Sequence, residues 1–238
     1  MKNLPLLLLS LAFSTALLAQ KPAAYYDSGQ IKWQGNFNLE GTDTIKQGYW
    51  IYYHPNGQLA ASGEFRRNLK HGDWKLFYPS GIIKDMVRFS NGTMIGTRKQ
   101  FNELGTLQQV EAYRNGLLDG EYKEFFSSGI IKVTGRYSRG QPIGEWRHFQ
   151  ASGSLLSISK FRVTVVGDSL VSLKNGLFEI YQSSGKLQEK GQYKDDKRVG
   201  NWQFFNPNGT IREAATYDQE GAKTASTRYD ASGQPIKQ

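Results

Sequence analysis

Aromatic, aliphatic and glycine residues recur along the chain at a spacing that is 24 residues in most steps. If the first residue of each repeat unit is called position 0, then position 9 of every unit is glycine and position 5 is always aromatic. Position 11 is isoleucine or leucine and position 17 is aromatic in the first eight units. A fixed period of this kind is typical of repeat architectures. The units begin at Gln20, Gly48, Gly72, Gly96, Gly120, Gly144, Gly176, Gly200 and Thr224.

Each unit predicts a strand, a turn, a second strand and a second turn. The first turn contains the glycine of position 9, in segments such as Pro55-Asn56-Gly57, where a tight turn needs a positive φ. The second turn contains pairs such as Asn91-Gly92, Asn115-Gly116 and Arg139-Gly140. A helix is disfavoured, because glycine recurs too often and no apolar stripe follows the helical period.

Consecutive units predict an all-β fold, an elongated and twisted antiparallel meander of about 17 strands that forms a single array over residues 20–238. Positions 11 and 17 differ by an even number, so both are expected on one face of a strand. The ring at position 5 is expected to pack across the turn onto the same face. Three apolar rows would then follow one side of a sheet that is long enough to curl or twist.

Two units are longer than the period, and both extra segments follow position 17. One adds four residues around Leu39–Ile45, and the other adds eight around Val163–Val171. Both should therefore lengthen a hairpin and project from the same edge of the sheet. Insertions on one face of a repeat protein often form its binding side, although loops also lengthen at little cost without acquiring a function. Val165, Asp168 and Leu170 are the candidate binding residues of the longer segment.

Residues 1–19 are predicted to be a cleavable signal peptide. Lys2 precedes an apolar stretch from Leu4 to Leu18, and Ala19 supplies a small residue for cleavage. An uncleaved anchor is the alternative, but the stretch is short for a bilayer span and no later segment could cross a membrane. We therefore expect a periplasmic or extracellular protein. The absence of cysteine excludes disulfides, thiolate metal sites and a lipid-bearing cysteine.

The sequence gives no indication of an enzyme, a metal site or a cofactor. His54, His71 and His148 lie in different units without carboxylates at metal-binding spacing. Acidic residues recur at position 1, as Asp73, Glu121 and Glu145, but other units replace them, so we interpret them as solvent-facing. Serines cluster in turns, where they are turn formers. The net charge is +9, and with export this moderate excess argues against nucleic acid as a partner.

Position 2 carries a second set of rings, which is interrupted by Arg98. Positions 2 and 5 have opposite parity, so without a bulge the rings at position 2 would point away from the three rows. An exposed ladder of this kind could stack on sugar rings. The alternative is that the rings pack into the core or beneath lysine and arginine side chains. The rings named as a candidate binding surface are Trp50, Trp74, Tyr122, Trp146 and Trp202.

The units resemble a known repeat. Segments such as Gly72–Gly81 (GDWKLFYPSG) and Gly200–Gly209 (GNWQFFNPNG) are similar to the variant MORN repeat, and the resemblance extends from about Gln20 to Pro235. In bacteria such arrays are often identified as YwqK-like antitoxin proteins. The resemblance implies a MORN-like hairpin array and, through the antitoxin family, binding and neutralisation of another protein.

We conclude from the sequence that the chain is an exported interaction scaffold whose partner is another protein, with an antitoxin-like or immunity-like role as one form. The alternative is a module that binds polysaccharide or the cell surface through the rings of position 2. Burial of these rings would exclude the alternative.

Overall fold

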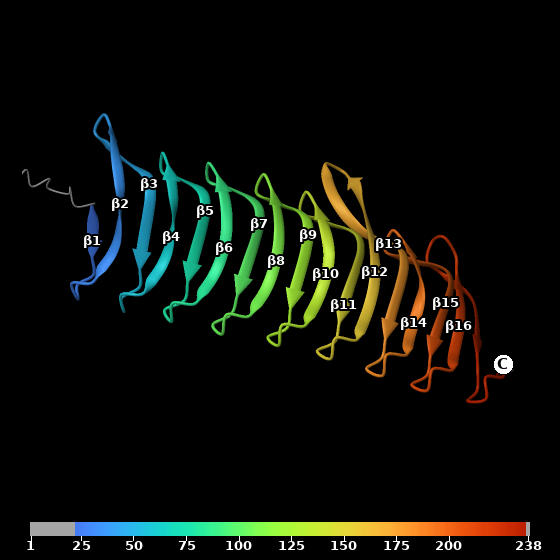
Figure 1. Cartoon of the computed structure of the whole chain (residues 1–238). Helices are drawn as coiled ribbons and strands as arrows, with labels where there is room; N and C mark the ends of the chain where they lie inside the picture. Colours follow the sequence, from blue (N-terminus) through green and yellow to red (C-terminus); the bar gives the residue numbers. More distant parts are fainter. Residues whose placement is uncertain (1–21, 237–238) are drawn as a thin grey trace, which may run out of the picture.

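The computed structural model describes residues 22–236, which form one antiparallel sheet of 17 strands with no helix among them (Figure 1). Each strand from β2 to β16 pairs with the strand before it and the strand after it, as in the predicted meander. The all-β fold expected from the period is confirmed, and the predicted signal peptide lies outside the described residues. The strands are β1 (Ala23–Tyr25), β2 (Ile31–Glu40), β3 (Asp43–Tyr53), β4 (Leu59–Arg66), β5 (Leu69–Phe77), β6 (Ile83–Ser90), β7 (Thr93–Phe101), β8 (Leu107–Arg114), β9 (Leu117–Phe125), β10 (Ile131–Ser138), β11 (Gln141–Phe149), β12 (Leu155–Val166), β13 (Ser169–Tyr181), β14 (Leu187–Lys194), β15 (Lys197–Phe205), β16 (Ile211–Tyr217) and β17 (Lys223–Arg228).

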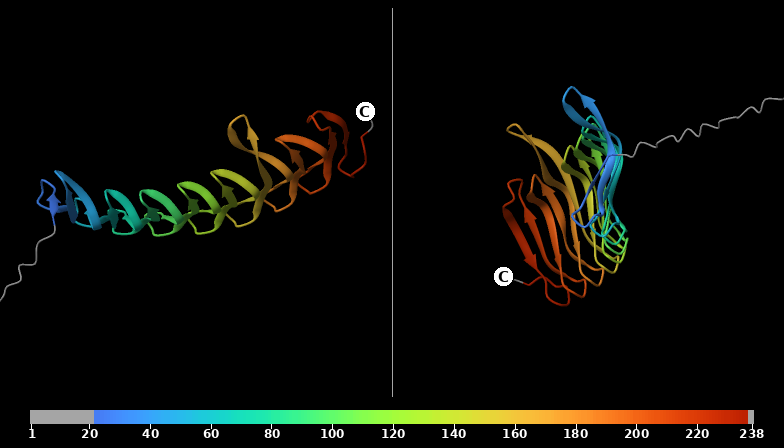
Figure 2. Two further views of the ribbon diagram at one scale, coloured as in Figure 1. Left: turned by 90° about the horizontal axis from the view of Figure 1, so that it is seen from above. Right: turned by 90° about the vertical axis from the view of Figure 1, so that its left-hand side faces the viewer.

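The sheet is long, twisted and a single layer deep, and within residues 22–236 no second layer covers either face (Figure 2). Its strands run across the long axis, with β1 at one end and β17 at the other (Figure 1). Two paired strands span about 10 Å along this axis, because neighbouring strands lie about 4.8 Å apart. A sheet of this kind has to build its core from side chains on its own surfaces.

The predicted turns form as the glycine pattern indicates. All nine glycines at position 9, from Gly29 to Gly233, have a positive φ. In the second turn, Asn91 and Gly92 have φ values of 46° and 81°, and the pairs at Asn115 and Arg139 follow the same pattern. Positive φ at both central residues is the type I′ geometry that matches the twist of paired strands.

Glycine at position 0, present in seven of the nine units, lies in a bulge in the first strand of its unit. Ser62 pairs with Lys75 and Glu64 pairs with His71, so a two-residue step on β4 matches a four-residue step on β5. Gly72 lies within the longer step with a φ of 67°, a conformation that residues with a Cβ rarely adopt. The glycines that begin the seven units from Gly48 to Gly200 all have positive φ.

The tryptophans of position 2 form the buried core of one face, which we call the aromatic face. A Cβ built on Gly63 would lie 2.3 Å from the indole of Trp74, so this ring covers the glycine backbone directly. The ring of Phe65, at position 17, packs nearly perpendicular to the same indole with ring centres 5.0 Å apart. The ammonium of Lys70 lies 4.6 Å from the indole centre, which is within the range of a cation–π contact.

Glycine at position 15 is matched to tryptophan in the following unit. Position 15 is glycine in the four units whose next unit has tryptophan at position 2. In the other units that include this position it is valine, glutamate, serine or alanine. These four are also the only glycines of the chain's 26 that lack a positive φ. Their role is therefore to leave room for an indole rather than to permit a turn. The pairs are Gly35 with Trp50, Gly63 with Trp74, Gly135 with Trp146, and Gly191 with Trp202.

The expectation that positions 5, 11 and 17 share one face is wrong. Contacts with Trp74 place the ring of Phe65, at position 17, on the aromatic face. The hydroxyl of Tyr53, at position 5, instead accepts a hydrogen bond from Gln34 Nε2 at 3.0 Å, on the other face. Bulges explain the error, because they break the strict alternation on which the parity argument depends.

Arg98 interrupts the tryptophan series with a buried polar cluster. Its Nη2 lies 2.6 Å from a carboxylate oxygen of Asp85, and its Nη1 lies 3.4 Å from Glu111. Asp85 and Glu111 are each only 7% exposed. The hydroxyl of Tyr113 donates to Glu111 at 3.0 Å. The hydrogen bond to Asp85 is the main cause that raises the pKa of Arg98, so the guanidinium stays charged.

Candidate interaction surfaces

The β12–β13 hairpin extends well beyond the edge of the sheet (Figures 1 and 2). Its strands remain paired up to Val166 and Ser169, around a turn at Gly167-Asp168. The β2–β3 hairpin also rises from this edge, so the two insertions project on the same side as predicted (Figure 1). We call the part of the longer hairpin from Val163 to Ser172 the free arm.

The base of the free arm is fixed to the neighbouring hairpins on both sides. Ser172 Oγ donates a hydrogen bond of 2.6 Å to the carbonyl of Pro142 in β11. On the other side, Arg162 Nε donates to Asp195 at 2.7 Å, and the backbone N–H of Lys174 donates to Asp196 at the same distance. The arm therefore leaves the sheet in a defined direction, because its base cannot pivot without breaking these bonds.

The tip of the free arm exposes apolar side chains to solvent. Val165 and Val166 are 66% and 58% exposed, and Leu170 is 38% exposed. Val165 and Leu170 are cross-strand partners, and Asp168 is exposed in the turn between them. The three residues predicted in this segment thus lie together, while Val166 was missed as a site residue. Its place in the apolar run of the insertion was the only signal for it.

The rings of position 2 do not form the exposed ladder expected of a sugar-binding surface. Trp50 and Trp74 are 1% and 2% exposed, and Trp146 and Trp202 are 6% and 0% exposed. Tyr122 is half-buried, and burial is the main cause that raises its pKa to about 12. The structure brings these rings together as core, because they lie on the same face as the rings of position 17 and pack against them.

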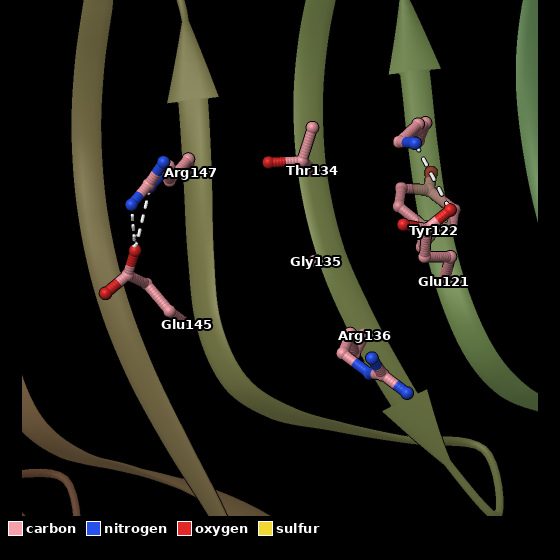
Figure 3. Close-up of a pocket in the computed structure, with 8 residues that line it drawn as sticks. Glu121, Tyr122, Thr134, Gly135, Arg136, Glu145 and Arg147 are labelled. Carbon is pink, nitrogen blue, oxygen red and sulfur yellow. Dashed lines mark hydrogen bonds and ion pairs between the residues drawn. The ribbon is translucent and has the colours of Figure 1, made fainter.

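The face opposite the aromatic face is polar and carries shallow hollows. One hollow of about 200 Å³ lies across β9, β10 and β11. Figure 3 shows Thr134 and Gly135 on the central strand of this hollow, between side chains of β9 and β11. Arg147 and Glu145 form an ion pair of 2.7 Å at its side. This polar face was not identified as a site from the sequence, although basic residues recur at position 3.

Residues 22–236 contain no group of three or more histidine, aspartate or glutamate side chains placed to hold a metal ion. None of these residues lies in a helix that is long and apolar enough to cross a membrane.

Comparison with solved structures gives only remote similarity. The chain is 15% identical to a protein in "Crystal Structure of TcdB2-TccC3", with a TM-score of 0.18, covering 88% of this chain and 13% of that one. For "Crystal Structure of TcdB2-TccC3-Cdc42" the identity is 10% and the TM-score is 0.18, covering 90% of this chain and 15% of that one. No curated protein matches the chain.

Five segments of the chain match the family model described as the MORN repeat variant. Every match starts two residues before the first residue of a unit and runs through one hairpin, so the family model and the repeat have the same register. The matched segments are residues 46–66, 70–91, 118–138, 174–195 and 198–219. Five hairpins of this array, from β3 to β16, therefore match the MORN repeat variant.

Proposed function

We propose that the chain is an exported scaffold that binds another protein through the free arm of β12–β13. Tandem MORN repeats are consistent with a scaffold for protein interaction. The observation that carries the proposal is the exposed apolar tip formed by Val165, Val166 and Leu170 on an anchored base. Apolar side chains that are held in water at a fixed position are typical of protein contact sites.

The array supports this role because it presents the arm in a fixed orientation. The strands on both sides of the arm are paired along their lengths, so the contact residues need little further ordering when a partner binds. A binding surface that is ordered in advance loses less entropy on association. A partner with a complementary apolar pocket would cover the tip, while Asp168 would remain at the rim.

Replacing Val163–Ser172 with Asn-Gly should abolish partner binding without unfolding the array. The replacement restores the 24-residue period and copies the turn seen at Asn115-Gly116. Photo-crosslinking residues placed at positions 165 and 170 should give one discrete adduct in cells that make the protein. We expect this adduct to be absent when the crosslinking residue is at Leu104, which is 84% exposed in the turn between β7 and β8. That turn lies at the opposite edge of the sheet (Figure 1).

The same adduct at positions 104 and 165, or none at 165 and 170, would contradict the proposal. The replacement variant serves as a second test. It should show the same thermal unfolding as the parent chain, and it should not compete with the crosslinking chain for the partner. Neutralisation of a toxic protein, as the resemblance to YwqK-like antitoxins implies, is one form of this binding. A growth-rescue assay with the crosslinked partner would test that form.

Export is part of the proposal, and it predicts a mature chain that begins at Gln20. Mass spectrometry of the protein recovered from the envelope or the medium should show the loss of residues 1–19. Recovery of the full-length chain in the membrane fraction would instead support an uncleaved anchor.

A further inference from the structure

The polar face carries a row of alternating basic and smaller side chains that crosses nine strands. Successive members are cross-strand partners from β4 to β12, so the pairing register places them side by side. Four basic residues therefore recur on every second strand, separated by residues without charge. We call this set the basic row: Ser62, Lys75, Met86, Lys99, Val110, Lys123, Thr134, Arg147 and Ile158.

Basic residues outnumber the acidic residues beside the basic row, so this strip of the surface has a net positive charge. Arg88 lies 3.6 Å from Asp73, and Arg136 and Lys160 are the strand partners of Glu121 and Glu145, which gives each acid a basic partner outside the row. Within residues 22–236, Lys75 and Lys99 form no ion pair. The pairs of Lys123 and Arg147 with Glu121 and Glu145 are part-exposed, and such surface pairs contribute little. Lys75 and Lys99 are therefore free to meet an acidic ligand, and Lys123 and Arg147 can exchange a weak surface pair for a ligand carboxylate.

An aromatic row flanks the basic row on the same face. Position 5 lies two residues beyond position 3 on each strand, so its rings lie about 7 Å from the basic row and parallel to it. Tyr181 donates a 2.5 Å hydrogen bond to Glu179, at position 3, which confirms that the two positions share this face. The rings in the basic stretch are half-buried and leave part of each ring in solvent: Phe77, Phe101, Phe125 and Phe149.

Hollows along the basic row provide space for a ligand lying across the strands. A hollow of about 290 Å³ includes Lys75, Met86 and Lys99 in its lining. The hollow drawn in Figure 3 continues the series at Lys123 and Arg147. On this surface, basic, aliphatic and aromatic side chains therefore form rows that run parallel to the long axis of the array.

The spacing of the basic row matches one polypeptide conformation. Two strand spacings separate successive basic residues by about 9.6 Å. A polyproline II helix has three residues per turn and rises about 3.1 Å per residue, so every third side chain returns to one side after about 9.3 Å. The mismatch over the four basic residues is only about 1 Å. In an extended β-strand, by contrast, residues three apart point to opposite sides.

We propose that the polar face binds an acidic polypeptide segment in the polyproline II conformation, with aspartate or glutamate at every third residue. The carboxylates meet Lys75, Lys99, Lys123 and Arg147, and the intervening residues lie over Met86, Val110 and the phenylalanines of position 5. Grooves lined by aromatic side chains are a recurrent way of binding this conformation. The site is separate from the free arm and does not depend on it.

Two fluorescent peptides of equal composition test the proposal by anisotropy at low ionic strength. One peptide repeats Glu-Pro-Pro four times, and the other places its four glutamates together between prolines. We expect the periodic peptide to bind more tightly than the clustered one. The K99E/K123E variant should weaken binding of the periodic peptide about tenfold or more, because like charges then face each other.

The K186E/K194E variant is the matched control, since it makes the same charge change at exposed lysines beyond the basic row. It should change the affinity by less than about twofold, and all variants should keep the thermal unfolding midpoint of the parent chain. The variant with Val163–Ser172 replaced by Asn-Gly should bind the periodic peptide normally, so failure of the free arm and failure of this site are distinguishable. Equal binding of both peptides, no peptide binding, or preference for a polyuronate oligosaccharide of equal charge would overturn the proposal.

Discussion

Replacing Arg98 with methionine should destabilise the centre of the array by about 3–5 kcal/mol. The change removes the cation but leaves Asp85 and Glu111 in place, each 7% exposed and without the partner that compensates its charge. Breaking a buried ion pair from one side costs about this much, because the remaining charge stays desolvated. Denaturant unfolding followed by tryptophan fluorescence would measure the loss.

The triple variant D85A/R98M/E111A separates this charge effect from simple loss of packing. With both acids removed, most of the stability should return, since replacing a whole buried ionic cluster with apolar residues is often neutral or stabilising. The control R88M alters an exposed arginine one strand away and should change stability by less than about 0.5 kcal/mol. A triple variant as unstable as R98M would show that the cost lies in packing rather than in uncompensated charge.

Replacing Gly63 with alanine should cost about 3 kcal/mol, although only one methyl group is added. That methyl would lie 2.3 Å from the indole of Trp74, so the ring or the strand has to move. Overpacking in a well-packed core costs about 1–3 kcal/mol and at times more. The thermal unfolding midpoint should fall, and the fluorescence of Trp74 should shift as its indole becomes exposed.

The double variant G63A/W74L tests the cause. Leucine removes the ring that alanine would strike, so the two changes should cost less together than the sum of their separate costs. Ser159→Ala is the matched control, because Ser159 occupies position 15 in a unit whose next ring is Phe178, and a Cβ is already present there. Additive costs in the double variant would mean that Gly63 is needed for its backbone conformation and not for the indole.

Much of the fold could be predicted from the sequence because the turns depend on single residues. Turns that need a positive φ place glycine at the same positions of successive units, as at Gly57 and Gly92, and the strands lie between these glycines. The interruption at Arg98 and the two long hairpins were visible for the same reason, since each breaks a regular period. The pairing of Gly63 with Trp74 is also present in the sequence, as a match between glycine at position 15 of one unit and tryptophan at position 2 of the next.

The assignment of faces could not be predicted in this way. Counting even and odd positions placed Trp74 away from Phe65, because it assumed that the ring of position 5 shares a face with Phe65. The pairing shifts by one residue at Phe77, and the rings of Trp74 and Phe65 are in contact. The side chains that lie next to each other on adjacent strands could not be predicted from the sequence either, because they depend on the register of strand pairing. Without that register, Asp85 does not point to Arg98 as its partner, and Lys99 does not align with Lys75.

The single-layer architecture allows the length of the molecule to change in steps of one repeat unit. Each hairpin rests on the hairpins before and after it, so duplication or loss of 24 residues changes the length by about 10 Å and leaves the remaining contacts intact. The distance between the two projecting hairpins is fixed by how many units separate them. Evolution can therefore adjust the reach of such a protein by counting units, without redesigning an interior.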